Sequence, residues 1–162
     1  MSGKAVRLPL VFALATSLLA SSLFAQKPIK VPYPFEPHEF DAGMVCSFPV
    51  LIEGSGNQSQ ISFPSGRTMT VGAGIARVTN TATGQSVALA TTGRLAETLL
   101  PDDYVLFSGS GQSLLFLFPQ DVTGPALILT TGRSELLYNI ATDTVTAVHA
   151  KGRSLDVCAA LE

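Results

Sequence analysis

Two histidines, His38 and His149, are the side chains of this sequence best suited to acid–base catalysis. With Asp143 or Asp156 and one of the many serines, His149 would complete the triad of a hydrolase. No G-x-S-x-G motif or comparable nucleophile sequence accompanies it, so a histidine at the end of a strand is the simpler interpretation. His38 lies among prolines that leave its geometry undefined. The sequence therefore predicts no catalytic residue, and a hydrolase using His149 stays an alternative.

Metal binding finds little support in the spacing of the possible ligands. Two distant histidines and two cysteines do not make a zinc set. Asp102, Asp103 and Asp121 offer oxygen atoms to calcium, but they lack the alternating acidic spacing of a dedicated calcium loop. Pro-Asp-Asp-Tyr is also an ordinary turn sequence. We expect neither a metal site nor a cofactor.

Arginine is the one polar residue that recurs in a pattern, because four arginines each follow a glycine: Arg67, Arg94, Arg133 and Arg153. If the corresponding turns gather at one end of the fold, these side chains would form a small basic crown that contacts a carboxylate or a phosphate. The alternative is that they keep the turns soluble and protect strand edges.

The first 25 residues have the composition of a signal peptide. Lys4 and Arg7 precede an uncharged, mostly apolar run over residues 8–25, and cleavage is expected after Ala25 or after Ser22. An uncleaved anchor is the alternative, although the polar, proline-rich sequence that follows favours removal. We therefore expect a secreted protein, found in the medium or in the cell envelope, without stable membrane insertion once the signal is removed.

Cys46 and Cys158 are the only cysteines, and they bracket most of the chain. In an oxidising compartment such a pair closes as a disulfide. We place Cys46 in the first strand of the domain and Cys158 in the last. A bond between them requires the two ends of the domain to meet.

The exported chain of 137 residues carries eight Lys and Arg against twelve Asp and Glu, a net charge near −4. Nucleic acid is a poor partner for such a chain, since phosphate binding needs a basic surface. Residues 26–43 form a proline-rich N-terminal segment, and residues 44–162 form one domain.

Alternation of apolar and polar residues after Cys46 predicts an all-β domain of about nine or ten short strands. Residues 114–118 are apolar throughout, so we expect a central strand that is covered on both faces. Six glycines that precede strand-like runs are interpreted as turns: Gly66, Gly84, Gly93, Gly111, Gly132 and Gly152. The fold expected is a single antiparallel meander, either a barrel or a two-sheet sandwich, closed by one disulfide.

Several segments resemble a group of small secreted actinobacterial all-β proteins with two cysteines, for which no activity is established: Cys46–Val50, Phe63–Arg67, Val78–Val87, Phe116–Asp121 and Asp156–Leu161. The resemblance spans about residues 44–161. It implies an exported location and a β fold, and it transfers no functional residue.

The sequence specifies a β fold but no recognisable set of catalytic or metal-binding residues. It therefore predicts a non-catalytic domain with a binding or structural role outside the cell. The alternative to a protein partner in the cell envelope is a small apolar ligand, carried inside a β-barrel that the phenylalanines and residues 114–118 would line.

Overall fold

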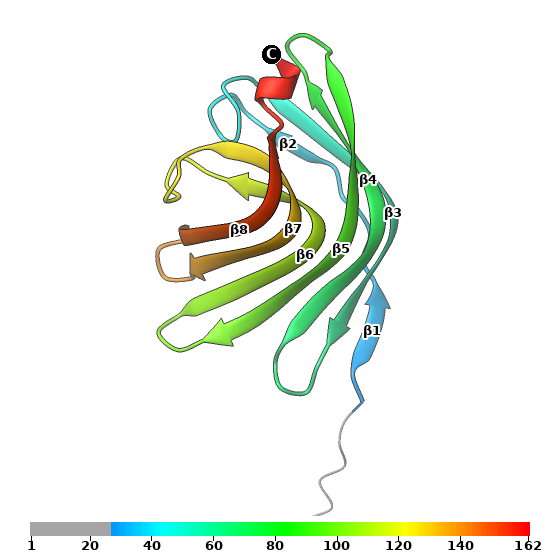
Figure 1. Cartoon of the computed structure of the whole chain (residues 1–162), viewed down its shortest axis with the longest axis vertical. Coiled ribbons are helices and arrows are strands. Elements are labelled where there is room, and N and C mark those ends of the chain that lie inside the picture. Colours follow the sequence, from blue (N-terminus) through cyan, green and yellow to red (C-terminus); the bar gives the residue numbers. More distant parts are fainter. Residues whose placement is uncertain (1–26) are drawn as a thin grey trace, which may run out of the picture.

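A computed structural model describes residues 27–162, and this part of the chain is all-β (Figure 1). The expected signal peptide lies outside the described residues. Eight strands form a single antiparallel sheet, and one short 3₁₀ helix, η1, ends the chain. The elements are β1 (Ile29–Pro32), β2 (His38–Phe40), β3 (Val50–Ser62), β4 (Thr68–Asn80), β5 (Ser86–Leu100), β6 (Tyr104–Leu117), β7 (Ala126–Asn139), β8 (Thr144–Asp156) and η1 (Ala159–Leu161).

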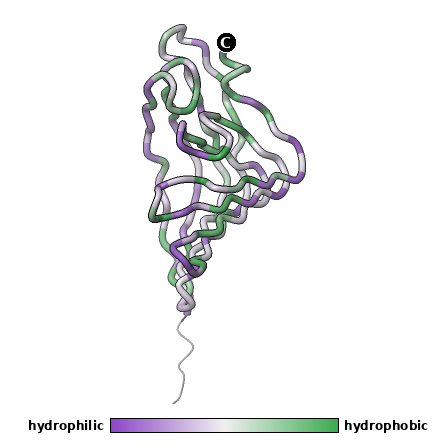
Figure 2. Tube along the Cα trace, turned by 90° about the vertical axis from the view of Figure 1, so that its left-hand side faces the viewer, coloured by the Kyte–Doolittle hydropathy of each residue, from purple (hydrophilic) through white to green (hydrophobic). Residues whose placement is uncertain are grey.

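The sheet is a meander in the order β1-β3-β4-β5-β6-β7-β8, with β2 pairing beside β1 on the same edge of β3. Hydrophobic and hydrophilic residues are interspersed along the trace (Figure 2), and residues two positions apart such as Val50 and Ile52 are buried on one face, as a period-two pattern predicts. The all-β antiparallel meander and its disulfide are thus confirmed, but the sheet does not close into a barrel. Over residues 27–162 the sheet therefore encloses no barrel lumen, the feature that the alternative of a carried apolar ligand required.

Six of the strands, β3 to β8, are 13 to 15 residues long. Of the six glycines interpreted as turns, only Gly66 and Gly84 lie in hairpin connections. Gly93, Gly111, Gly132 and Gly152 lie inside β5, β6, β7 and β8, so that interpretation was wrong for these four. Each merges two expected short strands into one long strand, which explains why fewer strands are found than expected.

These interior glycines pair with one another across the sheet. Gly72 pairs with Gly93, Gly93 with Gly111, Gly111 with Gly132, and Gly132 with Gly152. We call this set of five the glycine row. At Gly111 and Gly132 the φ angles are +102° and +125°, and an added Cβ would overlap a backbone oxygen of the adjacent strand. Only glycine fits such a conformation and such a close approach.

The sheet bends and divides at the glycine row. β5 pairs with β6 only between Gly93 and Leu100, on one side of the row. Residues 86–92 of β5 therefore separate from residues 112–117 of β6. β6 and β7 are bent into a C, and both ends of each strand lie on the left in Figure 1. Because β6 to β8 fold back at the bend, one sheet supplies both layers of a sandwich.

Two apolar clusters fill the space that this folding creates. The larger lies between β3–β5 and the returning parts of β6 and β7, and it includes Ile52, Val78, Leu89 and Leu129. The smaller contains Leu115, Leu117 and Leu136 inside the C of β6–β8. Leu114 and Phe116 pack on the first cluster while Leu115 and Leu117 belong to the second, so this part of the predicted run 114–118 is covered on both faces. Phe118, its last residue, follows the end of β6 and packs on the first cluster.

The disulfide joins the two ends of the domain, with a Cα–Cα distance of 5.5 Å across a sequence separation of 112 residues. Neither cysteine lies in a strand, contrary to the sequence-based placement: Cys46 precedes β3 and Cys158 follows β8. Cys46 is 4% exposed and belongs to the larger core. A covalent bond therefore replaces the hydrogen bonds that would close a barrel.

Candidate functional site

The proline-rich segment crosses the sheet as a strap, defined here as residues 33–37 between β1 and β2. β1 pairs with Ser59–Ser62 and β2 with Val50–Ile52, at opposite ends of β3. The amide of Tyr33 also donates to the carbonyl of Gln58 at 2.9 Å. Pro34 and Pro37 have no backbone N–H to donate to a neighbouring strand. They therefore suit a segment that leaves the edge of β3 between the pairings of β1 and β2.

Phe35 anchors the strap on two glycines. Its ring lies against Gly54 of β3 and Gly74 of β4, where an added Cβ at Gly74 would be 2.7 Å from Cε2 of Phe35. A side chain at Gly54 would overlap the same ring. The two glycines thus form a niche whose depth depends on their having no Cβ, and a flat aromatic ring fills it.

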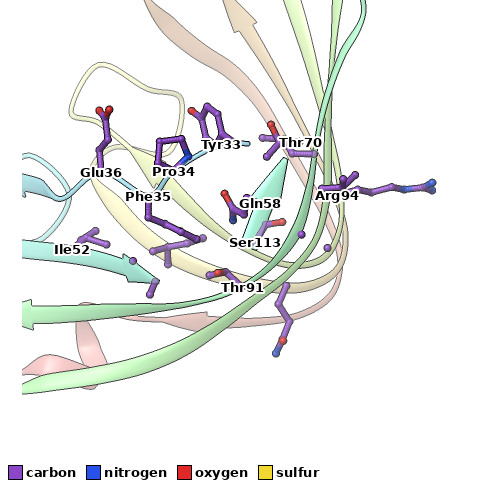
Figure 3. A pocket seen from close by; sticks show the side chains of 18 of the residues that line it. Tyr33, Pro34, Phe35, Glu36, Ile52, Gln58, Thr70, Thr91, Arg94 and Ser113 are labelled. Atoms are coloured by element: carbon purple, nitrogen blue, oxygen red, sulfur yellow. The ribbon is translucent and has the colours of Figure 1, made fainter. Parts of the chain in front are cut away.

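Below the strap lies a cleft of about 410 Å³, where β5 and β6 separate. Aromatic and aliphatic side chains share its lining about equally with polar and charged ones, and the apolar atoms provide most of the exposed surface. Figure 3 shows Phe35 directed into this space and Glu36 directed away from it. Such a volume and such a mixed lining are typical of small-molecule sites.

Three hydroxyl residues, Thr70, Thr91 and Ser113, line the cleft from three different strands. Oγ1 of Thr91 is buried and has no hydrogen-bond partner within residues 27–162. Glu97 also reaches the cleft, and its Oε2 accepts a hydrogen bond from Oγ1 of Thr68 at 3.0 Å. The Thr91 hydroxyl is therefore a buried polar group beside the cleft without a partner in the described chain, a state that costs free energy.

A second, smaller hollow of about 350 Å³ lies beside Tyr138 and Asp143. The Tyr138 hydroxyl donates to Oδ1 of Asp143, and this bond raises the pKa of Tyr138 above its usual value, with smaller contributions from desolvation and from the charges of Asp143 and Asp121. Asp121 is buried and accepts from the amides of Phe118 and Val145 at 2.6 and 2.7 Å. These bonds connect the β6–β7 connection to β8, so the carboxylate of Asp121 has a structural role.

The histidines and the other candidate ligands lie apart from one another. His149 is exposed on β8, opposite Glu135, and has no hydrogen bond to a serine or a carboxylate in the described chain. Asp143 and Asp156, its expected triad partners, bond instead to Tyr138 and to the amide of Ala159. His38 is exposed at the rim of the cleft. Over residues 27–162 no three His, Cys, Asp or Glu side chains are grouped so as to hold a metal, and Asp102 and Asp103 form the β5–β6 turn.

Three of the four recurring arginines follow glycines of the bend, while Arg67 lies in the β3–β4 hairpin. Arg94 pairs with Ser110, Ser110 with Arg133, and Arg133 with Lys151. Cross-strand partners share a face, so these cations form a row on one side of the sheet. Figure 3 shows Arg94 directed away from the cleft. Arg94, Arg133 and Arg153 thus lie beside the bend and Arg67 lies elsewhere, so the four arginines do not gather at one end of the fold as a basic crown would require.

Sequence reasoning missed the cleft residues, although two signals were present. Phe35 stands between two prolines, and Gly54-Ser55-Gly56 is a run of small residues inside a strand. A glycine within a strand indicates the close approach of another group, but which group approaches is decided by the path of the strap.

Comparison of the chain with protein-family models, with curated protein sequences and with solved structures gives no match. The function is therefore argued from the cleft and the surface of this chain.

Proposed function

We propose that this chain is an exported, non-catalytic binding domain whose cleft beneath the strap takes a small, mainly apolar ligand. The observation that carries the proposal is the cleft of about 410 Å³ where β5 and β6 separate. It lies next to a well-packed core, and its volume is in the range of small-molecule sites.

The chemistry of the lining supports a ligand with an apolar body and one polar end. Leu95, Leu114 and Phe116 offer apolar surface, and the buried Thr91 hydroxyl is without a partner in the described chain. A ligand hydroxyl or carbonyl that reaches Thr91 would satisfy this group and fix its orientation.

Export is the second part of the proposal. It is supported by the signal-like composition of residues 1–25 and by the disulfide between Cys46 and Cys158. No helix within residues 27–162 is long and apolar enough to cross a membrane.

The test begins with native mass spectrometry of the chain purified from the secretions of its own host, with the disulfide intact. We expect a co-purifying small mass. Titration of ligand-free protein with 1-octanol and with octane, which has no oxygen, then measures the contribution of a ligand hydroxyl.

Two variants locate the binding. Leu95→Trp fills the cleft and should abolish octanol binding, whereas Leu99→Trp places the same side chain at a position that is 68% exposed and should leave binding unchanged. Thr91→Val keeps the shape and removes the hydroxyl, so it should weaken the binding of octanol by about fivefold and leave the binding of octane nearly unchanged. Equal octanol binding by Leu95→Trp and the unchanged chain would exclude this cleft as the site.

A further inference from the structure

The free edge of β8 carries a long exposed stretch of strand. β8 ends the strand order and pairs only with β7 among residues 27–162. Eight consecutive residues, His149–Asp156, are exposed. Near the start of β8 the backbone groups of Val145 are bonded to Asp121 and Val122 of the β6–β7 connection. Along an antiparallel edge, alternate residues direct their backbone N–H and C=O groups away from the partner strand, so the exposed stretch that follows presents hydrogen-bonding groups to an added strand.

This edge is also rigidly held at its C-terminal end. The amide of Val157 donates to the carbonyl of Leu127 at 2.9 Å, and Cys158 is bonded to Cys46. The opposite edge of the sheet differs, because β1 and β2 already cover β3 and the strap between them contains two prolines. A preorganised edge binds an added strand at a lower entropic cost.

Positive charge is concentrated beside this edge although the exported chain is acidic overall. Lys151 and Arg153 stand at alternate positions along β8, with the imidazole of His149 next in the same series, and Arg133 and Arg94 continue the basic row inwards. The nearest acids are engaged: Glu135 pairs with Arg133 at 2.9 Å, and Asp156 accepts from Ala159.

We propose that the β8 edge binds an extended acidic segment of a partner protein by strand addition. Backbone hydrogen bonds to β8 would supply affinity, and acidic side chains at every second position would face His149, Lys151 and Arg153. A second copy of this chain is a poor occupant, because antiparallel pairing centred on Gly152 places Lys151 opposite Arg153. This binding is independent of the cleft.

The probe is the peptide acetyl-Glu-Val-Glu-Val-Glu-Val-Glu-amide, titrated into the intact disulfide-bonded chain. Two control peptides replace either every Glu by Lys or every Val by Pro. We expect saturable binding of the first peptide only, since the lysine peptide is repelled and the proline peptide cannot join a ladder. Amide hydrogen exchange should slow at alternate residues of β8 when the peptide binds.

The protein variants separate this edge from general charge. Lys151→Glu with Arg153→Glu should weaken the peptide by about tenfold or more. The control variant, Arg67→Glu with Arg77→Glu, changes the net charge by the same amount at positions away from β8. It should weaken peptide binding much less. Equal binding of the proline peptide, unchanged exchange in β8, or a concentration-dependent homodimer through β8 would each overturn the proposal.

Discussion

At the scale of single residues, Phe35 is the contact on which the cleft depends. Its ring occupies the niche of Gly54 and Gly74, and it is half-buried although most of the neighbouring strap is exposed. The strap is otherwise held by the short strands β1 and β2 and by the Tyr33 amide. Removing this ring should therefore free the strap more than it weakens the sheet.

We predict that Phe35→Ala lowers the free energy of unfolding by about 1–3 kcal/mol and speeds hydrogen exchange over residues 29–40. Gly54→Ala should have a loss of similar size, because its Cβ would displace the ring. In the double variant the two losses should not add, leaving a coupling of about 1 kcal/mol or more. Ser55→Ala, exposed on the same strand, is the control; strictly additive losses would show that the ring does not occupy the niche.

Tyr138 gives a pH prediction, since its hydrogen bond to Asp143 raises its pKa. The hydrogen bond of the protonated Tyr138 therefore stabilises the folded protein fully below the pKa of the unfolded state, near 10. This stabilisation is lost as the pH rises through the higher pKa of the folded state. Asp143→Asn should lower the pKa of Tyr138, measured by tyrosinate absorbance. The free energies of unfolding of Asp143→Asn and of the unchanged chain should become more similar above pH 10. If the tyrosinate absorbance of Asp143→Asn rises at the same pH as that of the unchanged chain, the bond between Tyr138 and Asp143 is not present.

At the scale of elements, the glycine row determines the shape of the sheet. It lets β6 to β8 fold back while β5 continues past them, and the cleft opens at that division. A positive φ and the close approach of a neighbouring strand are two separate reasons for a glycine, and Gly84, Gly93 and Gly111 differ in which of them applies. Gly84 has a φ of +77° with open space around it, Gly93 has the close approach without a positive φ, and Gly111 has both.

We predict that Gly84→Ala costs about 1 kcal/mol, the usual penalty of a left-handed alanine. Gly93→Ala should cost more, because its Cβ overlaps the carbonyl oxygen of Ser110, and Gly111→Ala should cost the most, above about 3 kcal/mol. Urea unfolding of the three variants measures the order. If Gly93→Ala and Gly111→Ala lose no more than Gly84→Ala, the strands do not approach one another as closely as this at the bend.

At the scale of the whole molecule, the disulfide and η1 hold the two ends of an open sheet together. The side-chain amide of Asn80 donates to the carbonyl of Leu161 at 3.1 Å, and Leu161 is fully buried in the larger core. Cys46, in the same core, is bonded to Cys158 just before η1. Long-range closure in this fold therefore relies on one covalent bond and one docked helix.

We predict that Cys46→Ser with Cys158→Ser lowers the free energy of unfolding by about 4–5 kcal/mol, because the bond closes a loop of more than a hundred residues. Reduction of the unchanged chain should give the same loss, which separates the missing bond from the effect of two serines. An unchanged thermal midpoint after reduction would mean that the bond contributes nothing to stability.

The sequence by itself determined the local features of this protein. Alternation specified strands, the apolar residues 114–117 specified a strand covered on both faces, and two cysteines specified the staple. Each depends on the side chains of one segment or on a pair without competitors, so no knowledge of distant neighbours was needed.

Only the tertiary structure decided what the glycines do and where the site lies. Gly84 and Gly111 both precede strand-like runs in the sequence, yet one lies in a turn and the other inside a strand. Glycine suits either position because it accepts a positive φ and the close approach of another backbone. The cleft, the Phe35 niche and the basic row all arise where segments distant in the sequence meet, and strand register and the fold of the sheet bring them together.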